Sequence, residues 1–346
     1  MLFRQSFDEC EVLDILLWLK FSLCAIVIVF SGTQLSKYGD ILAEKTGLGR
    51  SLIGVILMAS VTSLPELITG ISAVTIANVP DIAVGDVLGS CAFNLLVLCM
   101  LDAMHRGKPI LASAHQVHIL SAAFGIVLLA IAAISIIFPH YNVPILWVGG
   151  SSILVAAVYL LALKFISSYE TRQKNGLLHN KPEEITYTDI TVKQAAVRYV
   201  FNAAVVIAAA AFLPVIGKEI AVSTGLGQTF VGNIFMALAS SLPEVVVCFA
   251  AVRIGAIDLA IGSIFGSNIF NIFILFIDDL FYIPGPLLAV TSPTHIIPAI
   301  AAITMTAIAI IGLVNRDESK YLPLAGNSIA MVAVFAANIV LLYLAI

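Results

Sequence analysis

The sequence predicts an all-α polytopic membrane protein, and two observations support this fold class. Of the 346 residues, 60% are hydrophobic and 11% are charged, and the mean hydropathy is +1.07. A soluble domain is about half apolar and about a quarter charged, so this chain has too few charged side chains to cover a surface in water. Soluble enzymes, nucleic-acid-binding proteins and disordered chains are therefore disfavoured.

Ten apolar segments are long enough to cross a bilayer, which takes about 20 helical residues. They lie at 13–35, 51–77, 81–101, 116–137, 143–167, 196–221, 229–254, 258–281, 289–314 and 325–345. A polar stretch separates them into two sets of five. We therefore expect a first five-helix repeat over residues 1–166, a cytoplasmic loop over 167–194 and a second five-helix repeat over 195–346.

The lysines and arginines support the count of ten spans. Fourteen of the 17 fall in predicted loops on one side of the membrane, whereas only Arg4 and Lys218 fall on the other side and Lys20 lies within the first span. Cytoplasmic loops carry an excess of Lys and Arg. We expect a multi-pass protein of the cell (plasma or inner) membrane, with both termini extracytoplasmic.

The two halves contain an internal repeat. The motif S-L-P-E at 63–66 recurs at 241–244, an offset of 178 residues. After one residue is dropped, Asp81 aligns with Asp258 and Gly89 with Gly266 at an offset of 177. Because each half has an odd number of spans, the second copy crosses the membrane in the opposite direction. The pattern predicts the inverted repeats of secondary transporters.

Glu66 and Glu244 occupy matching places near the middle of the second and seventh spans. A charged carboxylate facing lipid is costly, so each glutamate must face the other, a cation or water. The alternative is a protonated glutamate in a helix–helix hydrogen bond, which a matched pair disfavours. Pro65 and Pro243 each remove a backbone donor just before the glutamate, which predicts that both helices are broken there.

Oxygen-bearing groups surround the two glutamates in the sequence. They are the carbonyls near Ala59, Thr62, Ala237 and Ser240, the hydroxyls of Thr62, Ser63, Ser240 and Ser241, and two matching stripes, Asp86–Ser90–Asn94 and Ser263–Ser267–Asn271. The spacing i, i+4, i+8 puts each stripe on one helical face. An all-oxygen set suits hard cations such as Ca²⁺ and Na⁺. Interhelical hydrogen bonding alone is the alternative for the serines and asparagines.

Four motifs carry a family resemblance: T-S-L-P-E at 62–66, S-S-L-P-E at 240–244, G-D-V-L-G-S at 85–90 and G-S-I-F-G-S-N-I-F-N at 262–271. On these motifs the sequence resembles the cation/calcium antiporter superfamily, and within it the prokaryotic sodium/calcium exchangers. The resemblance implies ten helices and alternating access by sliding of the first and sixth spans. It implies main Ca²⁺ ligands at Glu66 and Glu244, shared Ca²⁺ and Na⁺ ligands at Thr62 and Ser240, Na⁺ sites lined by Ala59, Ser63, Ser90, Ala237, Ser241 and Ser267, and a centre completed by Asn94 and Asn271.

The sequence also departs from the family pattern. Asn271 stands where many members have Asp, Asp86 stands where Asn is frequent, and Cys91 stands where Asn is common. We therefore expect two glutamates to carry the central charge, with Asp86 at the periphery. The departures leave the coupling ion and the stoichiometry open.

The leading functional hypothesis is a secondary active antiporter that exchanges Ca²⁺ for Na⁺, and the alternative is exchange of Ca²⁺ or another divalent cation for H⁺. An intramembrane enzyme is disfavoured because the sequence has neither H-E-x-x-H nor G-x-G-D. A passive cation channel is the third option, and it differs from an exchanger because it would conduct cations without a counter-ion. We expect a monomeric transporter in the lipid bilayer with no cofactor and no nucleic-acid partner.

Asp278 and Asp279 are expected to be solvated at the outer end of a helix, or to form an entry funnel for cations. His115 and His118 are expected at the membrane interface.

Overall fold

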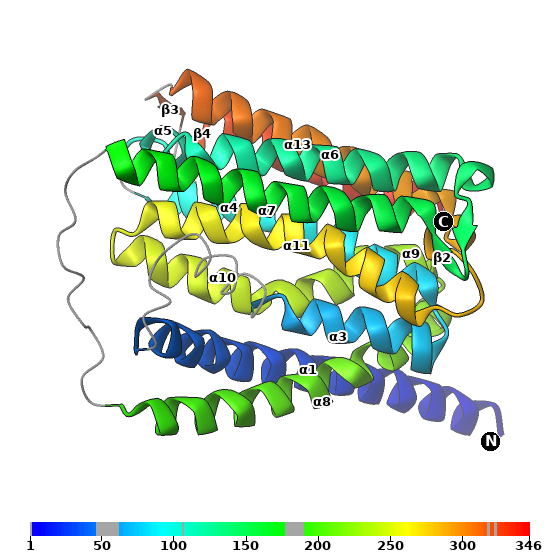
Figure 1. Cartoon of the computed structure of the whole chain (residues 1–346). Helices are drawn as coiled ribbons and strands as arrows, with labels where there is room; N and C mark the ends of the chain where they lie inside the picture. Colours follow the sequence, from blue (N-terminus) through cyan, green and yellow to red (C-terminus); the bar gives the residue numbers. More distant parts are fainter. Residues whose placement is uncertain (1, 46–61, 106, 177–189, 317–318, 322–323) are drawn as a thin grey trace.

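The computed structural model describes the whole chain except residues 1, 46–61, 106, 177–189, 317–318 and 322–323 (Figure 1). Its long helices are α1 (Leu2–Lys45), α4 (Pro80–Met104), α6 (Val117–Ile137), α7 (Gly150–Gly176), α8 (Val192–Thr224), α10 (Ala237–Arg253), α11 (Ile257–Phe281), α13 (Ile296–Asn315) and α14 (Gly326–Leu344). Helix α3 (Leu64–Ser72) continues into the π-helical η1 (Ala73–Ala77), and α9 (Gly227–Val231) leads through the π-helical η3 (Gly232–Met236) into α10.

Short elements close the ends of the bundle. They are α5 (Ile110–Ser113), α12 (Leu287–Val290), the 3₁₀ turns η2 (Pro139–Tyr141) and η4 (Pro293–His295), and two hairpins, β1 (Pro144–Ile145) with β2 (Val148–Gly149) and β3 (Lys320–Tyr321) with β4 (Leu324–Ala325). In both hairpins the strands pair antiparallel.

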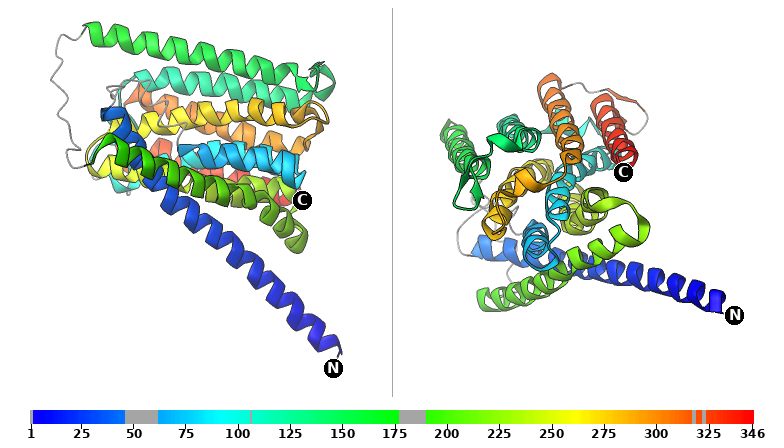
Figure 2. Two further views of the ribbon diagram at one scale, coloured as in Figure 1. Left: turned by 60° about the horizontal axis from the view of Figure 1, so that its bottom comes forward. Right: turned by 90° about the vertical axis from the view of Figure 1, so that its right-hand side faces the viewer.

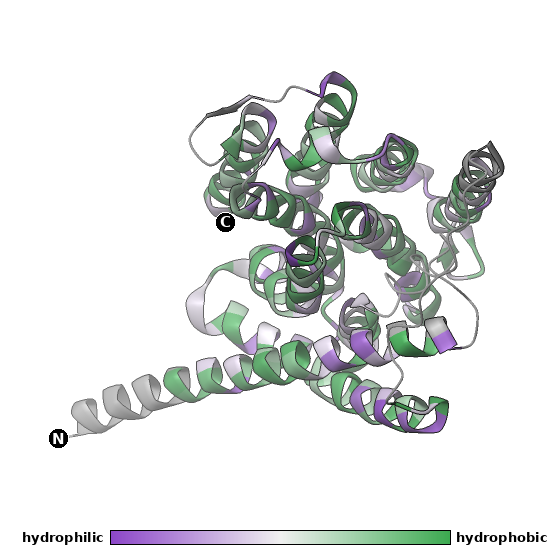
Figure 3. Ribbon diagram, turned by 90° about the vertical axis from the view of Figure 1, so that its left-hand side faces the viewer, coloured by the Kyte–Doolittle hydropathy of each residue, from purple (hydrophilic) through white to green (hydrophobic). Residues whose placement is uncertain are grey.

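Within the described ranges, nine helices are long and apolar enough to cross a membrane, and Leu64–Ala77 is a shorter apolar helix. This confirms the polytopic class, and Figure 3 shows hydrophobic residues predominating along the bundle helices. The span expected at 51–77 is described only from residue 62 onward. Helix α7 continues to Gly176, beyond the start of the polar stretch at 167. Residues 170–174 include Glu, Arg, Gln and Lys, which are good helix formers.

The helices cross the bundle in alternating directions, and both chain ends lie at one end of it (Figure 1). We call this end, which also holds β1 and β2, the terminal face; the opposite face holds α5, β3 and β4. Helices α4 and α11 lie inside. Helices α1 and α8 pack on each other along one side, with α1 also against α10 and α8 also against α3 (Figure 2).

Glycines let α4 approach the seventh span closely. A Cβ added at Gly89 would collide with the backbone of Asn233 and with the Ala237 side chain, and a Cβ at Gly85 would lie 3.0 Å from the Gly232 Cα. Such a contact is available only to residues without a side chain. The small residues of the third span therefore bring the polar stripe of α4 against the start of α10.

The interruptions of the second and seventh spans take different forms. Helix α3 begins at Leu64 with Ser63 in a turn, directly before Glu66, as expected. In the seventh span the expected break before Glu244 is absent, because Pro243 lies inside α10. The helix departs from α geometry earlier, in η3. A proline removes only its own donor and is tolerated where neighbours pack around it; here Gly32 of α1 leaves room for its ring.

Four aspartates, which we call the aspartate ties, hold the ends of α4 and α11. Asp81, at the start of α4, accepts hydrogen bonds from His295 Nε2 (3.0 Å) and Ser292 N (2.7 Å). Asp258, at the start of α11, accepts them from His118 Nε2 (3.0 Å) and His115 N (2.7 Å). The two sets of partners differ by 177 residues, so the same tie occurs once in each repeat and joins it to the other.

The other two ties lie near the opposite helix ends. Asp102 accepts hydrogen bonds from Ile110 N, Ala325 N and Ser328 Oγ at 2.8–2.9 Å. Asp279 accepts them from Leu287 N (2.6 Å) and Gly149 N (2.8 Å). These partners again correspond between the repeats. Both ends of α4 and of α11 are thus fixed to the opposite half of the chain.

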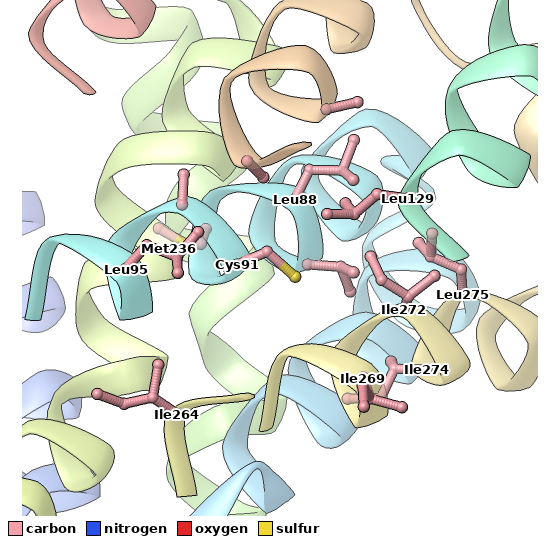
Figure 4. Close-up of a cluster of buried hydrophobic side chains, with 14 of the residues drawn as sticks. Leu88, Cys91, Leu95, Leu129, Met236, Ile264, Ile269, Ile272, Ile274 and Leu275 are labelled. Carbon is pink, nitrogen blue, oxygen red and sulfur yellow. The ribbon is translucent and has the colours of Figure 1, made fainter. Parts of the chain in front are cut away.

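Apolar packing fills the space beside the polar stripes. Figure 4 shows Cys91 of α4 among Leu88, Leu129, Ile272 and other buried aliphatic side chains. The Cys91 thiol donates to the Asn268 carbonyl of α11 (3.7 Å). Cys91 therefore belongs to the contact between the two interior helices.

Candidate functional site

The S-L-P-E motifs of the two repeats, at 63–66 and 241–244, meet in the middle of the bundle through reciprocal hydrogen bonds. Ser63 Oγ donates to Glu244 Oε1 (3.2 Å), and Ser241 Oγ donates to Glu66 Oε1 (2.8 Å). The exposed fractions of Glu66 and Glu244 are 0% and 1%. Each glutamate is therefore held by the serine of the other repeat, as a two-fold relation between the copies requires.

A second reciprocal pair links the broken spans to the interior helices. Thr62 Oγ1 lies 3.5 Å from Ser267 Oγ, and Ser90 Oγ lies 3.5 Å from Ser240 Oγ. These distances are long for hydroxyl–hydroxyl bonds, which centre on about 2.7–2.8 Å. The four hydroxyls therefore gather where the two repeats meet, and hydroxyl oxygens are among the groups that bind hard cations.

Asp86 breaks the two-fold relation and corrects one expectation. Its Oδ1 accepts a hydrogen bond from Ser240 Oγ (2.8 Å), and the side chain is fully buried. Asp86 thus lies in the centre rather than at the periphery, because it is one turn before Ser90, which also faces Ser240. The equivalent residue in the second repeat is Ser263, so the first repeat supplies a third buried carboxylate.

Several polar atoms around these bonds have no hydrogen-bond partner among the described residues. They are Glu66 Oε2, Glu244 Oε2, Asp86 Oδ2, Asn94 Oδ1, Ser263 Oγ and both side-chain polar atoms of Asn271. The ion pairs described in the structure involve Asp81 and Asp258 and reach none of the three central carboxylates. A buried carboxylate without a counter-charge costs several kcal/mol. The arrangement requires cations or protons.

The chemistry of the centre is that of oxygen donors. Among the described residues, no three His, Cys, Asp or Glu side chains converge into a metal-binding cluster. A cation here would need hydroxyl, amide and backbone oxygens in addition to carboxylates. Ala237 illustrates this, because its buried carbonyl accepts the Ser240 hydroxyl at 3.4 Å. Such mixed oxygen sets are typical of Ca²⁺ and Na⁺ rather than of zinc or copper.

The structure brings together most of the residues singled out in the sequence. Glu66, Glu244, Thr62, Ser63, Ser90, Ser240, Ser241, Ser267, Asp86 and Ala237 are joined through the bonds above, and Asn94 and Asn271 are buried on the same stripes. Ala59 lies outside the described residues.

Sequence reasoning missed the role of Asn268. It accepts a hydrogen bond from Asn94 Nδ2 (2.9 Å) and donates one to the Cys91 carbonyl (3.1 Å). The sequence does contain a signal for this role, because the aligned positions of the two repeats differ, with Cys91 in the first and Asn268 in the second. Asn268 of α11 thus bonds α4 at two positions, the Asn94 side chain and the Cys91 backbone.

One further expectation is wrong. Asp278 and Asp279 are both fully buried rather than solvated, since the end of α11 packs inside the bundle. His118 lies at the start of α6 and is buried against Asp258, with 10% of its side chain exposed, whereas His115 is 73% exposed; the position of both at the membrane interface stays a prediction.

The sequence profile described as "Sodium/calcium exchanger protein" matches residues 16–165 and 195–344. The chain belongs to the sodium/calcium exchanger family. It is therefore a multi-pass membrane transporter of the cation/Ca²⁺ exchange class and not an enzyme. The two matched segments are separated by residues 166–194.

Two curated proteins are similar to the chain over most of its length. Inner membrane protein YrbG of Escherichia coli strain K12 is 26% identical over 264 residues, which cover 72% of this chain and 75% of YrbG. The putative antiporter CaxA of Alkalimonas amylolytica is 26% identical over 253 residues, covering 71% of this chain and 75% of CaxA.

Solved structures share the fold. The H⁺/Ca²⁺ exchanger CAX has a TM-score of 0.68 with 10% identity, covering 95% of this chain and 86% of CAX. The sodium–calcium exchanger NCX_Mj has a TM-score of 0.59 with 20% identity, covering 94% of this chain and 98% of NCX_Mj. At these identities the likeness concerns the fold alone.

Proposed function

We propose that this family member is a secondary active antiporter that exchanges Ca²⁺ for Na⁺ by alternating access. One observation carries the proposal: the glutamates of the two repeats are fixed by each other's serines, and each has its second carboxylate oxygen buried without a partner among the described residues. Oxygens held in this way, at the middle of the bundle, are arranged for a cation that enters from either side.

Charge balance supplies the coupling. Glu66, Glu244 and Asp86 together carry three negative charges when ionised. One Ca²⁺ neutralises two of them, whereas three Na⁺ neutralise all three. Because the same oxygens serve both ions, a site loaded with Ca²⁺ excludes Na⁺ and the reverse. Mutual exclusion at one site converts a Na⁺ gradient into Ca²⁺ transport.

The proposed ligands combine the bonded residues described above with those that the sequence motifs imply. Glu66 and Glu244 are the principal Ca²⁺ ligands, and Thr62 and Ser240 contribute to both ions. The Na⁺ positions use Ser63, Ser241, Ser90, Ser267 and the carbonyls of Ala59 and Ala237, with Asn94, Asn271 and Asp86 completing the centre.

Helices α1 and α8 are the proposed moving parts. They pack on each other outside the interior helices, whose ends the aspartate ties hold in place. An open apolar groove of about 430 Å³ runs along the outer surface between α1 and α10, lined by residues that include Val29, Phe30 and Leu242. Sliding of α1 past Pro243 would use this space, and the fully buried centre corresponds to a closed state.

Coupling to H⁺ is the second candidate, and it rests on a specific observation. The H⁺/Ca²⁺ exchanger CAX shares the fold over most of this chain. The same three carboxylates can be neutralised by protons instead of Na⁺. Exchange of another divalent cation is the remaining variant.

Flux measurements in proteoliposomes distinguish these functions. We expect an imposed Na⁺ gradient to drive ⁴⁵Ca uptake, and Glu66→Gln or Glu244→Gln to abolish it. Replacing the Na⁺ gradient with a pH gradient tests H⁺ coupling. Uptake that persists without any counter-ion would show a channel, and activity retained in both variants would contradict the site.

The proposal includes the arrangement of the chain in the membrane. We propose a monomer in the cell membrane with both termini outside, since 14 of the 17 lysines and arginines fall in the loops predicted on the other side of the membrane. The five-helix repeats would then span residues 1–166 and 195–346.

A further inference from the structure

Asp278 is a buried carboxylate that belongs neither to the central site nor to the aspartate ties. Its exposed fraction is 0%, and neither carboxylate oxygen has a hydrogen-bond partner among the described residues. It packs against Gly70 of α3 so closely that a Cβ added at Gly70 would collide with the carboxylate. The neighbouring Thr69 Oγ1 is also buried without a described partner.

The repeat relation shows that the fold does not require this carboxylate. The aspartate ties occur once in each repeat, with equivalent partners. Asp278 has no such counterpart, because the aligned residue of the first repeat is Leu101 and the residues aligned with Thr69 and Gly70 are Val247 and Cys248. A need common to both repeats would produce an acid in both. The buried carboxylate of Asp278 is therefore present at the contact between α3 and α11 but not at the equivalent contact of the other repeat.

The position of Asp278 places it between the centre and the terminal face. It follows Asn271 by seven residues, about 10 Å further along α11, and lies three residues before the helix ends at Phe281. Gly70 follows Glu66 by one turn of α3 in the same direction. The seam between α3 and α11 thus runs from the central carboxylates to Asp278.

We infer that Asp278 forms a second cation site on the terminal side of the centre, and that this site takes a hard monovalent cation. The inference rests on the proposed function, since it adds a stage to the same ion path. One carboxylate balances one positive charge, whereas Ca²⁺ sites combine six to eight oxygens and usually several carboxylates. The absence of a Cβ at Gly70 allows the carboxylate to lie against the α3 backbone.

Such a site would load from the terminal face before the central site. A monovalent cation held at Asp278 is within about two helical turns of Asn271 along α11. Because the opposite face has Leu101 and Cys248 at the equivalent positions, the effect would be limited to one side of the membrane. Asymmetric affinity for the coupling cation is therefore the signature of the site.

Equilibrium binding tests the site independently of transport. In purified Glu66→Gln/Glu244→Gln protein, we expect NaCl or KCl to raise the thermal unfolding temperature relative to choline chloride, and the added change Asp278→Asn to remove this rise. A rise caused by CaCl₂ alone, the absence of any cation-specific rise, or a rise unaffected by Asp278→Asn would overturn the inference. None of these results depends on whether the wild-type protein exchanges Ca²⁺.

A glycine pair provides a matched control. Gly70→Ala would displace the Asp278 carboxylate and should abolish the same rise, whereas a Cβ at Gly125 of α6 meets nothing within 4 Å and Gly125→Ala should leave it unchanged. In oriented proteoliposomes, Asp278→Asn should raise the half-saturating monovalent cation concentration about tenfold or more at the terminal face only. An equal shift at both faces would contradict a sided site. If the wild-type protein does not exchange Ca²⁺, the proposed function is rejected, and the binding test still decides whether Asp278 forms a cation site.

Discussion

The hydrogen bonds from Ser241 and Ser63 to the two glutamates can be tested by removing each hydroxyl. The Ser241→Ala change deletes the donor 2.8 Å from Glu66 Oε1, and Ser63→Ala deletes the donor 3.2 Å from Glu244 Oε1. Each bond fixes one carboxylate oxygen and so leaves Oε2 to face a cation. Without the bond, the carboxylate is free to turn, and cation binding has to order it again.

The structure sets the size of the effect. A hydrogen bond to a charged group contributes about 1.5–3 kcal/mol, and here it stabilises the carboxylate orientation that binds the cation. At about 1.4 kcal/mol per factor of ten, the shorter Ser241 bond predicts Ca²⁺ binding weaker by about 10- to 100-fold. The longer Ser63 bond predicts a loss near the lower end of that range.

Calcium titration of the purified protein by isothermal calorimetry measures these losses. Ser135→Ala is the matched control, because Ser135 is a buried serine of α6 whose hydroxyl bonds only its own helix, at the Ile131 carbonyl (2.7 Å). We expect this control to bind Ca²⁺ like the wild type. If Ser241→Ala and Ser63→Ala also bind Ca²⁺ like the control, the glutamates are not held by the opposite repeat in the binding state.

Three further changes test other parts of the structure. Gly89→Ala forces a Cβ into the Asn233 backbone and should lower the free energy of unfolding by about 3 kcal/mol or more, measured by thermal unfolding; stability equal to the wild type would refute the close contact. Asp279→Ala leaves two buried backbone donors without their acceptor and should cost about 1–3 kcal/mol for each in the same assay. Asp86→Asn removes one central charge and should reduce the number of monovalent ions moved per Ca²⁺, so that the dependence of flux on membrane potential changes; an unchanged dependence would exclude Asp86 from the coupling.

The sequence predicts the membrane class and the pairing of the repeats because both depend on residue type and periodicity. Apolar runs of membrane length have few alternatives to a spanning helix. The identical motifs around Glu66 and Glu244 also required a shared environment, and the reciprocal serine bonds are the form it takes.

Other features depend on packing that a single sequence does not display. Pro243 indicates a lost backbone bond, but whether the helix breaks or absorbs it depends on the space offered by Gly32 of α1. Burial of Asp278 and Asp279 depends on which neighbours cover the end of α11, and an aspartate near a helix end is otherwise an ordinary surface residue. The central position of Asp86 follows from its contact with Ser240 of the other repeat, a partner 154 residues away.

The aspartate ties carry an implication for the history of the chain. In every tie, an interior helix of one half bonds backbone or side-chain donors of the other half. A single five-helix unit could therefore provide all the hydrogen-bond donors of these aspartates only by associating with a second unit of opposite orientation in the membrane. A gene for such a unit would have encoded an antiparallel homodimer before duplication and fusion joined the two copies. Once fused, the copies were free to diverge, and differences such as Asp86 against Ser263 record that freedom.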